Sequence, residues 1–477
     1  MSGHDSPAAG ATPAGATSAP GGAAPTAAVP AGTPPPDGRG LKRVLGLPSL
    51  FFFGLAYMVP LAAFTTYGIV TDMTRGHLPT AFLVTLAAMT FTALGYANMV
   101  RAYPVAGSAY TYTQQAFGPA TGFLTGWALL LDYIFLPTIS YIVIGLYLGI
   151  AIPSVPAWIW VLATIVLVTG LNILGIKLVT GMNMVLVGAQ GVFIAVFLVM
   201  SYLTVSGRST PADLLAPFYS ADFSLTALIG GSAILCLSFL GFDAISTLSE
   251  EAREPERTIP RAIILCTLFC GLLFVVMAWA GHLVHPDWQN FTDPDSASVE
   301  VMARAGGGFL AAFFTAAYVA ACFASAMAAQ SAVSRILFSM GRDGALPRRV
   351  FGAVHPKYRT PHLATLAVGA VSLLACVMTL DLAAALVSFG ALIAFTFVNL
   401  SVIKHYAVGL GRRRGTDFLR YVLTPGIGVA LTLWLWTSLS WLTFVIGLSW
   451  VGLGFLLLLR LTRGFTRPAP TMDDRVD

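Results

Sequence analysis

The sequence predicts an all-α integral membrane protein with twelve transmembrane helices. Of its 477 residues, 57% are hydrophobic and only 10% are charged, whereas a soluble globular chain carries about 25% charged residues. The mean hydropathy of +0.80 agrees. The formal charge of +5 is spread over a mostly apolar chain. These values exclude a soluble enzyme and a nucleic-acid binder, and they make the lipid bilayer the expected surroundings of the protein.

The chain divides into a tail, a long apolar region and a second, short tail. Residues 1–40 are almost wholly Ala, Gly, Pro, Ser and Thr, a composition that cannot bury enough apolar surface to offset chain entropy. We expect a disordered cytoplasmic tail there, a twelve-helix domain over 41–465 and a cytoplasmic tail over 466–477. The five cysteines show no metal-ligand spacing, so no metal site is expected.

Twelve apolar segments approach the roughly 20 residues that a bilayer crossing needs. The eleventh and twelfth are separated only by a turn around Ser440. The segments extend over 48–70, 79–99, 119–148, 155–174, 180–205, 224–248, 259–284, 306–335, 361–379, 382–404, 421–440 and 442–462.

The basic residues predict the orientation of these segments. If the amino terminus is cytoplasmic, all Lys and Arg except Arg75, Arg208 and Arg304 fall on the cytoplasmic side. Cytoplasmic loops of membrane proteins carry such an excess of basic residues. Both termini are therefore expected in the cytoplasm.

Two segments have sequences that do not suit a continuous helix. The first contains Gly54 and, at mid-membrane, Pro60, which lacks a backbone donor. The sixth contains Gly241 and the carboxylate of Asp243 at membrane depth. Each is the first member of a block of five segments, and matched interruptions of this kind indicate the midplane binding site of a transporter. Two independent kinks are the alternative interpretation.

Three motifs, in order and correctly spaced, resemble those of the amino acid–polyamine–organocation superfamily of secondary transporters. They are GSAYTY (107–112), SFLGFDAISTLSEEAREPERTIP (238–260) and MGRDGALP (340–347). The resemblance covers roughly residues 41–465. It implies a five-plus-five inverted repeat with discontinuous first and sixth helices and two further carboxy-terminal helices.

Within the superfamily the chain most resembles bacterial putrescine importers. The resemblance is carried also by GLAYMVP (54–60), LLDYIFLP (130–137) and VFGAVHPKYRTP (350–361). It implies proton-coupled import of a small cationic amine across the cell membrane. An amino-acid permease of the same fold is the alternative.

Two departures from the superfamily pattern bear on substrate and coupling ion. The first break reads Ala56-Tyr57-Met58-Val59-Pro60 without the second glycine of amino-acid permeases, which suits a substrate that has no carboxylate. Gln190 stands where some members carry a lysine in the fifth helix, so a proton site at that position is absent. Coupling to sodium is the alternative to protons, and no cofactor is expected.

Two intramembrane carboxylates are the leading candidates for substrate contact. Asp132 is expected to pair with a substrate ammonium or to carry the coupling proton, because charged groups at this depth are costly and are usually functional. A structural role in a polar helix contact is the alternative. Asp243 follows the break at Gly241, where an Asp also serves as a helix cap.

Aromatic side chains near the breaks are candidates to surround a cation, which gains about 0.5–2 kcal/mol over a ring face. Ordinary packing is the alternative for each of them. With backbone at Ala56 and Gly241, they complete the expected site: Tyr57, Tyr133, Phe239, Phe242 and Tyr318. Because successive helix positions point about 100° apart, Asp132 and Tyr133 are not expected to face the cavity equally.

Charged residues after the sixth segment form a further cluster. Glu250 and Glu251 lead a run that is expected to form a gate or a helix-capping network with the basic loop over 335–349. A solvated loop is the alternative. An integral-membrane enzyme is the rival from another class, but no histidine lies mid-membrane and no metal or nucleotide motif occurs. The expected partners are therefore a small cationic amine or amino-acid substrate and the bilayer, with no nucleic acid.

Overall fold

The computed structural model describes residues 43–466 apart from 208–209, 293–296, 343, 345, 438 and 465. The predicted tails 1–40 and 466–477 lie outside these residues, except for Thr466. Within the described part of the chain the elements are helical, and the only β-type pairing is an isolated bridge between Leu45 and Ala252.

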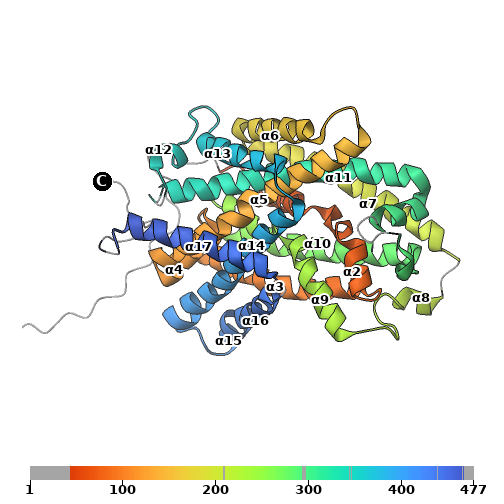
Figure 1. Ribbon diagram of the computed structural model, residues 1–477. Helices are drawn as coiled ribbons and strands as arrows, with labels where there is room; N and C mark the ends of the chain where they lie inside the picture. The colour runs from red at the N-terminus through yellow and green to blue at the C-terminus, as the bar shows by residue number, and fades with distance from the viewer. Residues whose placement is uncertain are drawn as a thin grey trace, which may run out of the picture. The chain divides into compact units, whose positions relative to one another are not determined.

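All twelve predicted segments are present as helices (Figure 1). Among the described residues, eleven spans are long and apolar enough to cross a membrane, and the ninth segment is a shorter apolar helix. In chain order the segments are α1 (Leu47–Met58), α3 (Leu78–Ala102), α5 (Pro119–Ala151), α6 (Ala157–Leu174), α7 (Ile176–Val205), α9 (Leu225–Leu235), α10 (Pro255–Val284), α11 (Ala297–Arg342), α13 (His362–Ser372), α14 (Leu380–Val402), α16 (Thr424–Trp436) and α17 (Trp441–Leu461).

Short elements extend or connect these helices. They are η1 (Pro60–Phe64), α2 (Tyr67–Met73), α4 (Ser108–Phe117), α8 (Pro211–Leu215), η2 (Cys236–Phe239), η3 (Asp243–Leu248), η4 (Trp288–Asn290), α12 (Arg348–Phe351), η5 (Leu373–Cys376), η6 (Ile403–Gly409), α15 (Thr416–Phe418) and η7 (Leu419–Leu423). Of these, η6 and η7 are π-helical and the other η elements are 3₁₀ helices.

Some predicted boundaries need correction. The eighth segment was expected to begin at 306, but α11 begins at Ala297 and is kinked where Gly306 and Gly307 leave helical geometry. Three consecutive glycines, 306–308, provide the conformational freedom for this kink. The turn predicted at Ser440 is confirmed, because its hydroxyl accepts the Thr443 N–H at 3.2 Å and caps α17.

The packing of the helices follows a repeat of five segments. The second segment packs on the seventh (α3 on α10), the third on the eighth (α5 on α11) and the fourth on the ninth (α6 on α13). The tenth packs on the third as the fifth packs on the eighth (α14 on α5, α7 on α11). Because five is odd, the second block enters the membrane from the opposite side, as in the inverted repeats of transporters.

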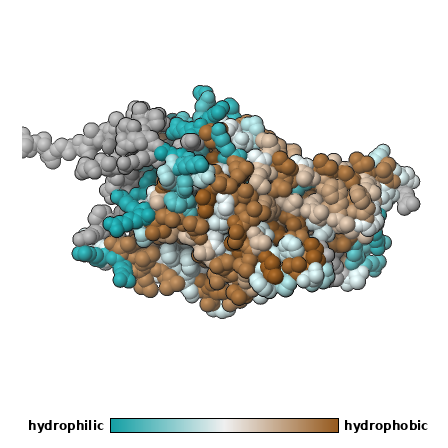
Figure 2. All heavy atoms as spheres, turned by 90° about the horizontal axis from the view of Figure 1, so that it is seen from above, coloured by the Kyte–Doolittle hydropathy of each residue, from teal (hydrophilic) through white to brown (hydrophobic). Residues whose placement is uncertain are grey.

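Burial separates central helices from peripheral ones. In the most apolar window of the span formed by α5, 72% of the residues are buried, against 22% for α17. Figure 2 shows the consequence on one face, where hydrophobic side chains cover the middle of the molecule and hydrophilic ones gather towards its ends. The helices α16 and α17 thus present their apolar side chains to lipid, while α5 lies at the centre beside both breaks.

Candidate functional site

The first segment is interrupted directly after Met58. Val59 has a φ of 53°, and Pro60 then starts the 3₁₀ helix η1 without a backbone N–H. This geometry releases backbone groups from the helical pattern, and the carbonyl of Tyr57 accepts a hydrogen bond of 3.1 Å from the hydroxyl of Ser325 on α11. The predicted break is confirmed, and α11 contributes a polar group to it.

The sixth segment is interrupted between Phe239 and Asp243. Leu240 is extended, and Gly241 has a φ of 121°, in the left-handed region that favours glycine. A Cβ at Gly241 would lie 2.2 Å from Cδ1 of Tyr57. The two breaks therefore meet at this contact, and both the backbone angle and the close approach require glycine.

The carboxyl group of Asp243 is held on both oxygens. The hydroxyl of Tyr133 donates to Oδ2 at 2.6 Å, and the N–H of Gly241 donates to Oδ1 at 3.3 Å. Asp243 is 1% exposed and begins η3. Its hydrogen bonds stabilise the start of the second half of the sixth segment and join it to α5.

Asp132 has a different environment, although it precedes Tyr133 on α5. It is 2% exposed, and its Oδ1 has no hydrogen-bond partner among the described residues. Its backbone faces α14 so closely that a Cβ at Gly390 would lie 2.6 Å from the Asp132 nitrogen. The carboxyl lies within electrostatic reach of Asp243 and of Tyr57. Asp132 is thus a buried carboxyl group with hydrogen-bonding capacity left over.

Two tyrosines lie against each other where the breaks meet. The rings of Tyr57 and Tyr133 pack edge to face with centroids 6.2 Å apart, and the Tyr57 hydroxyl has no partner among the described residues. Tyr96 on α3 was not predicted as a site residue, yet it lies within electrostatic reach of both Asp132 and Asp243. Nothing in the sequence around Tyr96 distinguishes it from other aromatic residues on apolar helices.

The structure places the other aromatic candidates in helix packing. Phe239 packs on Phe274 of α10 at 5.4 Å, and Phe242 stacks on Phe395 of α14 at 5.5 Å. Their rings therefore point to neighbouring helices on either side of the sixth segment.

Tyr318 lies beyond the first break. Its hydroxyl hydrogen-bonds with that of Thr65 at 2.7 Å, and its ring packs against Tyr147 at 5.3 Å. Ala56 is wholly buried in the last turn of α1. Since all nine predicted substrate-site residues are buried, the arrangement is closed around the breaks.

Gln190 lies on α7 at some distance in the sequence from the carboxylates. Its side chain is wholly buried, and both amide atoms have no partner among the described residues. Asn183 has the same properties and lies seven residues earlier, about two helical turns along the same face. Sequence analysis did not single out Asn183, whose spacing from Gln190 was the available signal.

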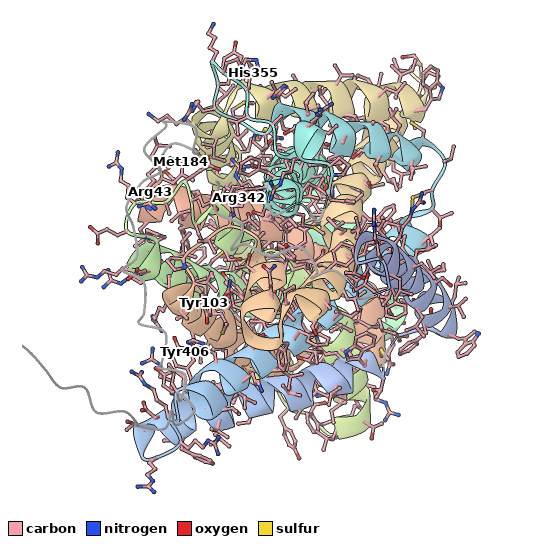
Figure 3. All side chains as sticks on the ribbon, turned by 90° about the vertical axis from the view of Figure 1, so that its left-hand side faces the viewer. Arg43, Tyr103, Met184, Arg342, His355 and Tyr406 are labelled. Carbon is pink, nitrogen blue, oxygen red and sulfur yellow. The ribbon has the colours of Figure 1, made fainter. Side chains whose placement is uncertain are left out.

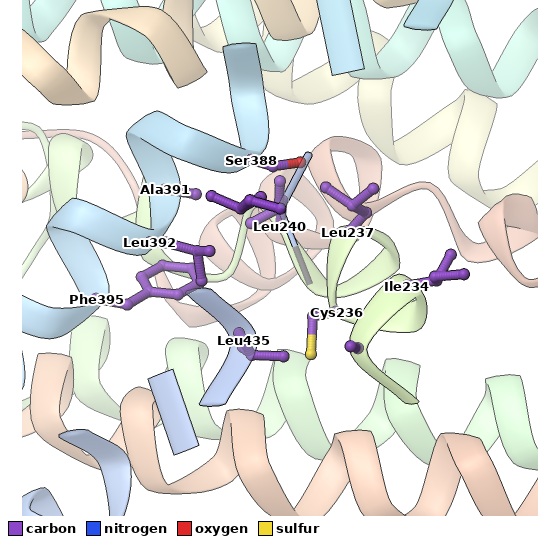
Figure 4. A pocket seen from close by; sticks show the side chains of 11 residues that line it. Ile234, Cys236, Leu237, Leu240, Ser388, Ala391, Leu392, Phe395 and Leu435 are labelled. Atoms are coloured by element: carbon purple, nitrogen blue, oxygen red, sulfur yellow. The ribbon is translucent and has the colours of Figure 1, made fainter. Parts of the chain in front are cut away.

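An apolar pocket lies beside the sixth segment (Figure 4). Its volume is 140 Å³, and Leu240, Phe395 and Leu435 are among its lining residues. No charged residue lines it, so it does not suit a cationic substrate, which needs a negative partner when it leaves water. The carboxyl groups beside the breaks are therefore the better candidate site.

The predicted cytoplasmic cluster forms ion pairs between the sixth and eighth segments, both in the second block. Glu251 pairs with Arg335, both about 4% exposed at the side chain, and Glu250 pairs with Arg342 at 2.7 Å. The chain before α1 joins the same cluster, because the Leu45 N–H donates to the Glu251 carbonyl at 2.9 Å. Figure 3 looks onto the end of the bundle that carries Arg342 and Arg43. The burial of the Glu251–Arg335 pair speaks against a solvated loop at these two residues.

Comparison with known proteins decides the family. Residues 49–467 match the family described as amino acid permease. The chain belongs to this family. Over 441 residues the permease is 42% identical to the low-affinity putrescine importer PlaP of Escherichia coli (strain K12). This alignment covers 91% of this chain and 97% of that protein. The predicted resemblance to the superfamily is thereby confirmed.

Other relatives of the permease are named for different substrates. It is 28% identical over 458 residues to the branched-chain amino acid permease BcaP of Bacillus subtilis, covering 89% of this chain and 94% of that protein. It is also 28% identical over 455 residues to the methylthioribose transporter of Bacillus subtilis, with the same coverage. Since the family and these relatives are transporters, the permease is a multi-pass membrane transporter and not an enzyme.

Proposed function

We propose that this permease imports putrescine or a related small polyamine, with protons as the coupling ion. The observation that carries the proposal is the buried carboxyl of Asp132, which keeps an unpartnered oxygen beside the meeting point of the two breaks. The 42% identity to a putrescine importer supports the same substrate class.

A diamine needs a negative partner once it has left water, because burying an unpaired charge is costly. Asp132 supplies that partner, while Asp243 is already held by Tyr133 and Gly241. The aromatic rings of Tyr57 and Tyr133, which pack edge to face, supply ring surface for the rest of the cation. One free carboxyl and an aromatic pair therefore match an amine better than a neutral molecule.

The first break also favours a substrate without a carboxylate. In transporters of this type, the amides at the start of a half-helix hold anionic substrate groups. Here the half-helix after the break begins with Pro60, which has no N–H to donate. If the substrate were an amino acid, which is the alternative, its α-carboxylate would have one backbone N–H donor fewer at this break.

Proton coupling rests on Asp132 as well. Gln190 is buried on α7 but cannot take up a proton, so it supplies polarity and no charge. Asp132 is the intramembrane carboxyl with free capacity, and proton exchange there would change the negative charge that the amine meets. We also infer insertion in the plasma membrane with both termini cytoplasmic, because basic residues such as Arg43 and Arg342 gather at one end (Figure 3).

Uptake of radiolabelled putrescine into proteoliposomes, with and without an imposed proton gradient, tests the proposal. We expect gradient-dependent uptake that unlabelled putrescine and spermidine compete with and alanine does not. Asp132→Asn is expected to lower uptake at least tenfold. The matched control Asp222→Asn changes an exposed carboxylate and should leave uptake unchanged.

Two outcomes would overturn the proposal. Uptake of alanine or a branched-chain amino acid without uptake of putrescine would make the protein an amino-acid permease. Full putrescine uptake by a well-folded Asp132→Asn variant would remove Asp132 from substrate and proton binding.

A further inference from the structure

A group of arginines lies where the tenth segment ends and the eleventh begins. Between 404 and 420 the chain carries Lys404, Arg412, Arg413, Arg414 and Arg420 against a single acid, Asp417. This stretch begins within the π-helical element η6 and ends within the π-helical element η7. The transport site uses none of these residues.

The guanidinium groups of Arg101 and Arg420 lie close together. Arg101 on α3 and Arg420 donate to the same side-chain oxygen of Asn98, at 3.3 and 3.2 Å. Arg101 is within electrostatic reach of both Arg420 and Arg261. Like charges so placed repel one another, and an amide oxygen cannot neutralise them.

No carboxylate compensates this charge in the described part of the chain. The ion pairs found there involve Arg257, Arg335 and Arg342, so Arg101, Arg412 and Arg420 have no acidic partner within 4.0 Å. All three side chains are exposed. The positive charge is therefore accessible to an anion from outside the protein.

Aromatic residues hold the guanidinium groups in place. Tyr421 stacks on Tyr406 with centroids 4.1 Å apart, and the Tyr406 hydroxyl donates to the Asn98 carbonyl at 3.1 Å. The Cζ atoms of Arg412 and Arg420 lie 6.0 and 5.2 Å from the Tyr421 ring centroid. Arginines ordered in this way suit bidentate recognition of a phosphate. Figure 3 shows Tyr406 and Tyr103 at the end of the bundle that carries this group.

Exposed apolar side chains accompany the arginines. Phe418 is 45% exposed, Leu419 55% and Leu410 56%, and they lie where the spans 382–409 and 416–436 end. Such side chains can contact the acyl chains of a lipid, whereas they would not contribute to the binding of a free anion. The combination of phosphate-binding groups and apolar surface is typical of lipid head-group sites.

We propose that Arg101, Arg412 and Arg420 bind the phosphate of an anionic membrane lipid. Purified protein in detergent would be titrated with phosphatidylglycerol, phosphatidylcholine or inorganic phosphate, and bound lipid measured by native mass spectrometry. We expect phosphatidylglycerol to bind at least tenfold more tightly than phosphatidylcholine. Each arginine removed is expected to weaken binding about fivefold.

Arg412→Gln is the first variant, because Arg412 contributes no side-chain hydrogen bond among the described residues and its loss should not disturb folding. Arg101→Gln with Arg420→Gln extends the test. Arg349→Gln, an exposed arginine on α12, is the matched control and should bind the lipid as the parent does.

Three results would overturn the proposal: equal binding of the two lipids, an equal loss in Arg349→Gln and Arg412→Gln, or inorganic phosphate displacing the lipid at equal concentration. Because no transport is measured, these results are independent of the proposed substrate.

Discussion

The hydroxyl of Tyr133 donates a 2.6 Å hydrogen bond to Oδ2 of Asp243, across 110 residues of sequence. This bond joins the third segment to the break in the sixth. The bond satisfies Oδ2 of Asp243. By contrast, Oδ1 of Asp132, the residue before Tyr133 on α5, has no hydrogen-bond partner among the described residues. The two buried carboxyl groups therefore differ in their hydrogen bonding.

Tyr133→Phe is expected to destabilise the fold, because Oδ2 of the buried Asp243 would lose its donor. Leaving a buried acceptor unsatisfied costs about 1–3 kcal/mol, measured here as a lower midpoint of thermal unfolding in detergent. Tyr141→Phe on the same helix is the control, since the buried Tyr141 hydroxyl has no partner among the described residues. Equal melting temperatures of the two variants would contradict the assigned hydrogen bond.

Gly241→Ala is expected to disrupt the contact between the two breaks. An alanine at a φ of 121° is strained, and its Cβ would meet Tyr57 at 2.2 Å. We expect a loss of about 2 kcal/mol or more in the free energy of unfolding, together with reduced uptake. Gly188→Ala on α7 has open space around it and should stabilise the helix by about 0.5–1 kcal/mol. A neutral Gly241→Ala would show that the two breaks do not meet there.

Breaking the ion pair of Glu251 and Arg335 should be costly. Removing one partner of a buried pair leaves an uncompensated charge, worth about 3–5 kcal/mol, so Glu251→Leu should strongly lower the unfolding midpoint. The double variant Glu251→Leu with Arg335→Leu should lose less than either single variant. Arg257→Gln breaks a pair that is about three-quarters exposed and should change the stability by less than about 1 kcal/mol.

Acid is expected to destabilise the carboxy-terminal end of α10 through His285. Burial and the nearby Arg304 lower the pKa of His285 below its ordinary value, although Glu300 and Asp287 oppose this. The folded state therefore binds a proton less readily than the unfolded chain. The stability that His285 contributes is full above its unfolded pKa of about 6.5 and is lost as the pH falls from there through its lowered folded pKa.

Thermal unfolding between pH 7.5 and 4.5 measures this effect. His285→Phe should flatten the fall in melting temperature, and Arg304→Gln should reduce it by removing the positive neighbour. An unchanged pH profile in His285→Phe would show that another group causes the acid loss.

Much of the fold follows from local sequence. Apolar runs of bilayer length specify the crossings, because lipid accepts only side chains of that kind. Pro60 and Gly241 reveal the breaks, because they are residues that a continuous helix does not favour. Two boundaries were less accessible: the kink of α11 at Gly306 and the short α13, since both depend on how neighbouring helices pack.

The site was only partly accessible in the same way. Asp132, Tyr133 and Asp243 stand out as polar groups in apolar segments, but the partner of each was not predictable. Phe239 and Phe242 flank the same break and yet point to α10 and α14. The membrane fold, the paired breaks and the family were therefore predictable from the residues alone. Which side chains meet at the breaks was not predictable, because apolar residues occupy both lipid-facing and protein-facing positions. The rotation of each helix depends instead on close contacts in the folded chain, such as that of Gly390 with Asp132.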